Sequence, residues 1–296
     1  MFKPVPVRTP GTAFRSLSWQ GLGLFLVSAA TLAFEINLTR LFSVSQFYHF
    51  AFMVVSIALL GFSASGTILS LLKDKQQEIE EKVFPWLACA AGTSMLGAYL
   101  LFNTFPFDSF SMIVDPSQLA ILILHYLALA SPFFFVGMII SLMLRKYRAE
   151  SGEVYALNLL GSAAGCLLAV ITPNWVDGEG VVFLGAVLSC LAGLLFLVSG
   201  ARINQRNHHR HIPAAISLFI VLLASLGLIG TRIASGEMPG FVQLTVSPYK
   251  SISYALQSPQ ARLANTGWNG FSKVDVVSSP SLHSLPGLSY QYLEPL

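Results

Sequence analysis

The sequence predicts an all-α polytopic membrane protein with about seven transmembrane helices and a short, partly β extramembrane tail at its C-terminus. Two observations predict this class. Charged residues make up only 10% of the chain and apolar residues 54%, whereas a soluble domain carries about 25% charged residues. Seven stretches also reach about 20 predominantly apolar residues, which is the length that crosses a bilayer.

The seven predicted spans define the domain organisation. Residues 1–16 form the N-terminus, residues 17–231 the transmembrane domain and residues 232–296 the tail. The fourth span carries Pro132 near its middle, which predicts a kink or a tilt. The spans are expected at 17–37, 47–72, 84–105, 117–144, 154–173, 180–199 and 212–231.

The distribution of charge predicts the orientation. Basic residues gather before span one and in every second connection, whereas the alternate connections hold one basic residue, Arg40. Because cytoplasmic loops are enriched in Lys and Arg, we expect a cytoplasmic N-terminus and a tail on the outer side. The alternate connections hold four acidic residues, which either attract a cationic solute such as a polyamine or only reflect this bias: Asp108, Asp115, Asp177 and Glu179.

A polar cluster is predicted where spans one and two meet. Glu35 lies near the outer end of span one, Arg40 in the connection, and His49 at the start of span two, so we expect all three at one membrane depth. Charge near hydrocarbon is costly and often marks a functional site. The cluster either binds a charged group or relays a proton, or else Glu35 and Arg40 pair to hold the turn while His49 bonds at the interface.

A second group of residues predicts close helix packing in span five. Gly161 and Gly165 form a GxxxG pattern, which lets two helix backbones approach each other, and Asn158 can hydrogen-bond across that contact. A ligand role for Asn158 is the alternative. His125 in span four is typical of a structural group with its hydrogen bonds satisfied, unless it faces Glu35 or His49.

The other chemistry-bearing residues predict no metal site and no nucleic-acid surface. Cys89, Cys166 and Cys190 show neither CxxC nor Cys/His spacing. No basic run alternates with aromatic residues in a polar segment. The sequence assigns no catalytic residues.

The tail predicts three short strands, at 241–246, 250–256 and 273–277, with a turn at Ser247–Pro248. Three short strands are marginal alone, and about 65 residues can form only a small core. We therefore expect the tail to begin a β or Rossmann-type domain, and the natural product to continue beyond Leu296.

Four segments together resemble the membrane-embedded spermidine synthase-like proteins. They are FEINLTRLFS at 34–43 with FYHFAFMVVSIALLGFSASG at 47–66, VYALNLLGSAAGC at 154–166, SPYKSISYAL at 247–256 and WNGFSKVDVV at 268–277. In that bacterial family a multi-span region precedes a Rossmann-type aminopropyltransferase or methyltransferase-like domain. The resemblance implies a cell inner membrane location and a C-terminal transferase domain as partner, in addition to the lipid bilayer.

The family's catalytic elements have no counterpart in the tail. The resemblance implies a glycine-rich strand–loop–helix for an S-adenosylmethionine-type cofactor and an acidic catalytic residue, but residues 232–296 contain no such loop, and Asp275 lies in a predicted strand. We therefore expect no cofactor in this chain and assign no catalytic role to Asp275. The function hypotheses are a membrane module of a spermidine synthase-like protein, a transporter-like module for a small charged solute, and a non-catalytic anchor or assembly protein.

Overall fold

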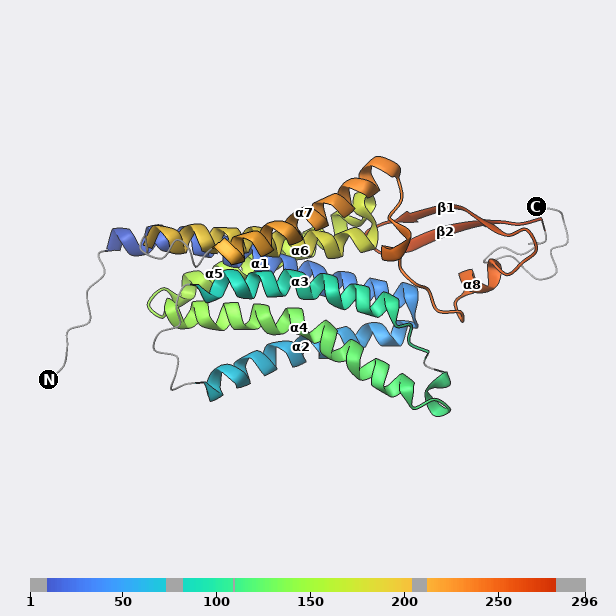
Figure 1. Cartoon of the computed structure of the whole chain (residues 1–296), viewed down its shortest axis with the longest axis horizontal. Helices are drawn as coiled ribbons and strands as arrows, with labels where there is room; N and C mark the ends of the chain where they lie inside the picture. The colour runs from blue at the N-terminus through green and yellow to red at the C-terminus, as the bar shows by residue number, and fades with distance from the viewer. Residues whose placement is uncertain (1–9, 73–81, 109, 204–211, 281–296) are drawn as a thin grey trace.

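Seven long helices form a membrane-spanning bundle, and a two-stranded ribbon projects from one end of it (Figure 1). The computed structural model describes residues 10–72, 82–108, 110–203 and 212–280. The predicted fold class is confirmed, because each of the seven helices is long and apolar enough to cross a bilayer. They are α1 (Pro10–Ser45), α2 (Tyr48–Leu71), α3 (Val83–Thr104), α4 (Ser117–Lys146), α5 (Ser151–Ile171), α6 (Pro173–Ile203) and α7 (Ile212–Ser235).

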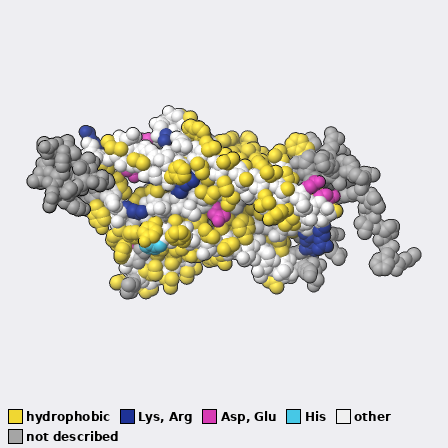
Figure 2. Space-filling model, turned by 180° about the vertical axis from the view of Figure 1, so that it is seen from behind, with side chains coloured by type: hydrophobic (Ala, Val, Ile, Leu, Met, Phe, Trp, Pro, Cys, Tyr) yellow, Lys and Arg dark blue, Asp and Glu magenta, His cyan; other side chains and the backbone are white. Residues whose placement is uncertain are grey.

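The surface of the bundle matches a lipid environment. Apolar side chains are spread over the face in Figure 2, and charged side chains are few on it. Most of the membrane-spanning part of α2, α5 and α7 lies on the outside of the bundle. In α1, by contrast, 67% of the membrane-spanning part is buried. α1 packs against α5, α6 and α2, so it is the central helix.

α1 runs further than the sequence predicted. The expected span ended at residue 37, but the helix continues to Ser45 and only two residues connect it to α2. Its last two turns bury Leu38, Leu41, Phe42 and Ser45, and this i, i+3, i+4, i+7 spacing is the apolar stripe of a packed helix. The placement of Arg40 in an outer connection was therefore wrong, because Arg40 lies inside α1.

α1 and α5 approach each other closely at two glycines. A methyl group at Gly161 would overlap the carbonyl oxygen of Phe25, and one at Gly165 would overlap that of Ala29. Beside this contact, the Ser28 Oγ donates a hydrogen bond to Asn158 Oδ1 at 2.8 Å. Small residues and polar bonds of this kind hold helices together in lipid.

α4 changes direction near its middle (Figure 1), where Pro132 lies inside the helix. A proline has no N–H, so the carbonyl four residues earlier loses its helical partner. That carbonyl belongs to Ala128, and the Ser131 Oγ donates a hydrogen bond to it at 2.7 Å. A neighbouring hydroxyl thus satisfies the freed carbonyl, as membrane helices require.

The tail contains less sheet than predicted. Residues 241–246 form no strand: the 3-10 helix η4 (Gly240–Val242) begins this stretch, and Val242 and Leu244 are buried in the main core cluster together with α1 and α3 residues. Residues 250–256 contain the short helix α8 (Ser251–Ala255), so both strand predictions were wrong. The third was right: β2 (Lys273–Ser278) pairs antiparallel with β1 (Arg262–Trp268), which the sequence analysis missed.

Replacing Gly161 with alanine should destabilise the bundle by about 1–3 kcal/mol, because the new methyl group forces α5 away from the α1 backbone. Thermal unfolding of the purified protein in detergent measures this loss. Gly66→Ala in α2 is the matched control, since a methyl group there meets open space and should leave stability unchanged or raise it. Equal unfolding temperatures for wild type and Gly161→Ala would contradict the packing role.

Candidate functional site

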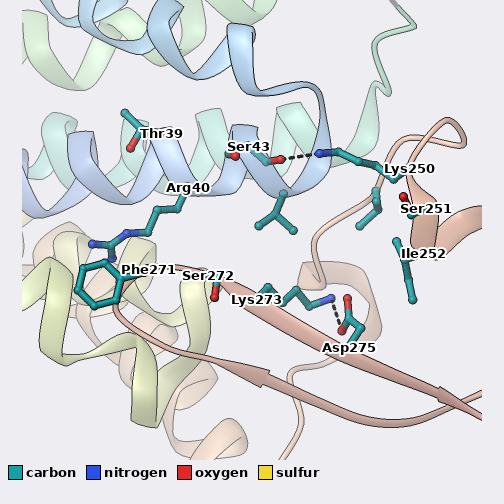
Figure 3. Close-up of a pocket in the computed structure, with 12 residues that line it drawn as sticks. Thr39, Arg40, Ser43, Lys250, Ser251, Ile252, Phe271, Ser272, Lys273 and Asp275 are labelled. Carbon is teal, nitrogen blue, oxygen red and sulfur yellow. Dashed lines mark hydrogen bonds and ion pairs between the residues drawn. The ribbon is translucent and has the colours of Figure 1, made fainter. Parts of the chain in front are cut away.

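A basic pocket of about 470 Å³ lies between the tail-side end of α1 and the tail (Figure 3). Arg40 reaches it from α1, Lys250 from the segment before α8, and Lys273 from β2. Three cations face one carboxylate, that of Asp275, so the lining has a net charge of +2. The pocket is lined by Thr39, Arg40, Ser43, Val44, Val246, Lys250, Ser251, Ile252, Phe271, Ser272, Lys273 and Asp275.

Each cation of this basic pocket has one protein partner among the described residues. The Lys250 Nζ donates to the Ser43 carbonyl at 2.6 Å, and burial lowers the pKa of Lys250. The Lys273 Nζ lies 3.1 Å from Asp275 Oδ1. Arg40 donates from Nη1 to the carbonyl of Ala169, where a cation complements the negative end of the α5 dipole.

The tip of the β1–β2 hairpin docks into the bundle beside the pocket. Trp268 at the end of β1 is only 8% exposed. Its ring lies against Gly178 of α6, where a methyl group would come within 2.8 Å, and near Leu41 of α1. Asn269 closes the turn, since its Oδ1 accepts from the backbone N–H groups of Phe271 and Ser272, both at 2.8 Å. Trp268 is thus the anchor of the hairpin.

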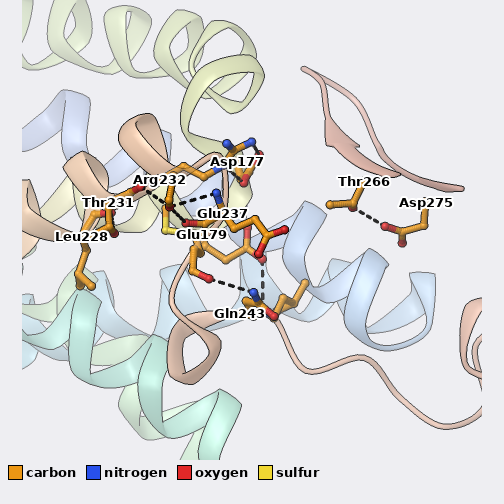
Figure 4. A network of polar contacts seen from close by, with 12 residues as sticks. Asp177, Glu179, Leu228, Thr231, Arg232, Glu237, Gln243, Thr266 and Asp275 are labelled. Carbon is orange, nitrogen blue, oxygen red and sulfur yellow. Dashed lines mark hydrogen bonds and ion pairs between the residues drawn. The ribbon is translucent and has the colours of Figure 1, made fainter. Parts of the chain in front are cut away.

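α6 is interrupted where the hairpin docks. Asp177 has a φ of 60° and a ψ of 177°, a conformation that non-glycine residues rarely adopt. Its carboxylate accepts from the Nε and Nη2 of Arg232 in the last turn of α7, the second bond measuring 2.9 Å (Figure 4). The Asn37 Nδ2 of α1 donates to the Gly178 carbonyl at 2.7 Å. Three helices therefore meet at this interruption.

Glu179 holds the tail main chain against the same interruption. Its side chain is 5% exposed, and Oε1 accepts from the Leu244 N–H at 3.2 Å. Its other oxygen, Oε2, is buried without a partner among the described residues, as is the Oδ1 of Asn37. Asp177 and Glu179 were expected in an outer loop. No such loop forms, because only Thr172 separates α5 from α6. Asp177 lies at the kink that joins the two helical pieces of α6, and Glu179 follows this kink by two residues.

α3 fastens the same stretch of the tail from the other side. The Tyr99 hydroxyl donates to the Val242 carbonyl at 2.6 Å. The Asn103 side chain donates to the Gln243 carbonyl at 2.9 Å and accepts from the Thr245 N–H at 3.1 Å. The tail from 242 to 245 therefore runs across the bundle with its backbone bonded to helix side chains.

The three residues of the predicted polar cluster lie at different depths. Glu35 lies ten residues before the end of α1, about 15 Å along the axis at 1.5 Å per residue. His49 lies in the first turn of α2, where its ring stacks on Phe47 at 5.6 Å. Glu35 forms no hydrogen bond or ion pair with another described residue, so no Glu35–Arg40 pair exists in this part of the chain. The expectation of one shared depth was wrong.

His125 and the two remaining acids have local roles. His125 is buried against Phe102, and neither Glu35 nor His49 lines the small cavity beside it. Asp108 accepts from the hydroxyls of Ser111 and Tyr249, and the Ser111 hydrogen bond holds the pKa of Asp108 below its usual value. Asp115 accepts from Ser117 in the same way, which lowers its pKa.

Several residues of this junction were not expected from the sequence. Asn37, Tyr99, Asn103 and Trp268 carry no motif spacing. The first three contact residues at least 140 positions away, and Trp268 contacts Gly178, 90 positions away. A buried asparagine inside a membrane span was the one available signal, because polar groups in hydrocarbon require a partner. Among the described residues, no group of three His, Cys, Asp or Glu side chains is placed to hold a metal ion.

Comparisons of this chain with protein-family models, with curated proteins and with solved structures found no match. The geometry of the site joins a membrane bundle firmly to an extramembrane ribbon and leaves a basic pocket at their junction.

Trp268→Ala should release the hairpin from the bundle while the bundle stays folded, because truncating a buried tryptophan costs about 3–5 kcal/mol. Limited proteolysis of the protein in nanodiscs measures the release as faster cleavage within residues 257–280. Phe271→Ala is the control, since that ring belongs to the same hairpin and is 84% exposed. Identical cleavage rates for the wild type and Trp268→Ala would show that Trp268 is no anchor.

Proposed function

We propose that this chain is the multi-pass membrane module of a spermidine synthase-like protein and that it holds a transferase domain at the membrane surface. The observation that carries the proposal is the fixed attachment of the tail to the bundle. Side chains of the two membrane helices α3 and α6, including Tyr99 and Glu179, bond the tail main chain, and Trp268 anchors the hairpin. A tail that holds no further domain in place needs no such set of contacts.

The hairpin itself supports an extramembrane partner domain. β1 and β2 form a two-stranded sheet among the described residues, and such a ribbon is marginal alone in water. It exposes Leu263 at 46%, Val274 at 55% and Val276 at 50%. Apolar strands with open edges are suited to pairing with further strands. The transferase domain of the resembled family would supply them.

The orientation belongs to the same proposal. The N-terminus lies in the cytoplasm of a bacterial cell, the helices cross the inner membrane, and the tail lies outside. Basic residues support this orientation, since Arg145, Lys146 and Arg148 lie at the opposite end of the bundle from Asp108 and Asp115 and cytoplasmic ends are enriched in Lys and Arg.

An antibody against residues 241–280 tests the module directly in membranes of the source organism. We expect a product well above 32.1 kDa, because the transferase domain adds its own mass. That product, purified in nanodiscs, should transfer aminopropyl groups or methyl groups from an S-adenosylmethionine-type donor. A product of 32.1 kDa, with no transferase bound to it, would contradict the proposal.

A transporter-like function is the second candidate, and Glu35 is the observation that favours it. A carboxylate inside a membrane span without a described partner is costly, and such groups often lie on the path of a solute or a proton. Thr39 and Ser43 follow Glu35 on α1 at intervals of four residues, so the three share one helix face.

Glu35→Gln should abolish uptake of labelled spermidine into proteoliposomes while the protein still inserts, because the neutral side chain no longer attracts the cation. Glu153→Gln is the control, since it removes a carboxylate from the exposed first turn of α5. Absence of uptake by the wild type, or equal uptake by wild type and Glu35→Gln, would exclude this second function.

A further inference from the structure

We propose that the basic pocket binds a phosphate group, carried either by an anionic phospholipid or by a soluble phosphate compound. The proposal rests on Arg40, Lys250 and Lys273, which face one cavity of about 470 Å³ from two separate parts of the chain. It goes beyond the membrane-module proposal and does not depend on it.

The pocket has hydrogen-bond donors that the protein does not use. An ammonium group has three donors and a guanidinium group five. Among the described residues, Lys250 donates one hydrogen bond, to the Ser43 carbonyl, and Arg40 donates one, to the Ala169 carbonyl. The remaining donors match the several acceptor oxygens of a phosphate, and charge-assisted bonds of this kind are about twice as strong as neutral ones.

The acid in the pocket does not cancel its positive charge. Asp275 Oδ1 accepts from both Lys273 Nζ and the Thr266 hydroxyl on the paired strand. One carboxylate against three cations leaves a net charge of +2 in the lining. A cationic ligand would meet this charge directly, so the pocket selects an anion.

The position of the pocket suits a group at the membrane surface. The membrane-spanning part of α1 covers Trp19–Ser45, 27 residues, or about 40 Å, which exceeds the roughly 30 Å hydrocarbon layer. At least one end of α1 therefore extends beyond the hydrocarbon layer, and we place the end with Arg40 and Ser43 at the level of the lipid head groups. Lipid phosphates reach this level from the bilayer, and soluble phosphates reach it from water.

Hydroxyl groups complete the phosphate-binding character of the lining. Thr39 and Ser43 face the pocket from α1, and Figure 3 shows them on the same side of the gap as Arg40, opposite Lys273 and Asp275. Burial lowers the pKa of Lys250, because desolvation disfavours the charged ammonium form. A bound phosphate would supply a counter-charge.

Two binding measurements on the full chain test the proposal and separate the two phosphate sources. Native mass spectrometry counts phosphatidylglycerol molecules retained by the detergent-purified protein, with phosphatidylcholine as the neutral comparison. Calorimetric titration with inorganic phosphate measures binding of the free anion. We expect the wild type to retain phosphatidylglycerol, to bind inorganic phosphate, or both, and Lys250→Gln to weaken that binding about tenfold, which corresponds to about 1.4 kcal/mol.

Controls make each outcome decisive. Arg262→Gln removes one cation from the same hairpin at an exposed position outside the pocket and should bind like the wild type, and Lys250→Arg should restore binding. If Lys250→Gln fails to fold, Lys273→Gln carries the test. Phosphatidylglycerol retention without phosphate binding assigns a lipid, and the reverse assigns a soluble compound. Absence of both, or equal loss in Arg262→Gln, overturns the proposal.

Discussion

The close packing of α1 against α5 and α6 is the contact on which the rest of the structure depends. Lipid offers no hydrophobic driving force between helices, so association relies on van der Waals contact and polar bonds. Gly161 and Gly165 let α5 approach the α1 backbone. This approach puts Arg40 within reach of the Ala169 carbonyl at the end of α5, and the packing of α1 against α6 puts Asn37 within reach of the interruption in α6. One helix thus positions both parts of the tail-side junction.

The interruption of α6 and the docking of the tail form one structural unit. A residue held at positive φ, such as Asp177, costs about 1–3 kcal/mol and persists only where its surroundings impose it. Arg232 binds its side chain, and Asn37 binds the carbonyl of the next residue. The opened backbone gives Trp268 a glycine surface to pack against. Irregular backbone in a membrane protein is tolerated where protein groups satisfy it, and here the same groups receive the tail.

Hydropathy predicted the seven spans well because lipid demands about 20 apolar residues whatever the partner helices are. Hydropathy did not predict where the helices end. The charge of Arg40 makes residues 38–45 resemble a connection outside the membrane. The spacing of Leu38, Leu41 and Phe42 nevertheless fits a buried helix face. In the tail, the alternation around Val242 and Leu244 was interpreted as a strand, but it serves to bury those two side chains against the bundle. Alternation reveals which residues are buried and not which element buries them.

The two sides of the basic pocket have different physical roles. Arg40 neutralises the end of α5 whether or not a ligand is present, so its charge belongs to the bundle. Lys250 and Lys273 belong to the tail, and Lys250 crosses to the Ser43 carbonyl of α1. An anion held by all three joins tail and bundle. Because a ligand stabilises the state that binds it, anion binding and tail docking are linked, and the ligand would strengthen the attachment on which the membrane-module proposal rests.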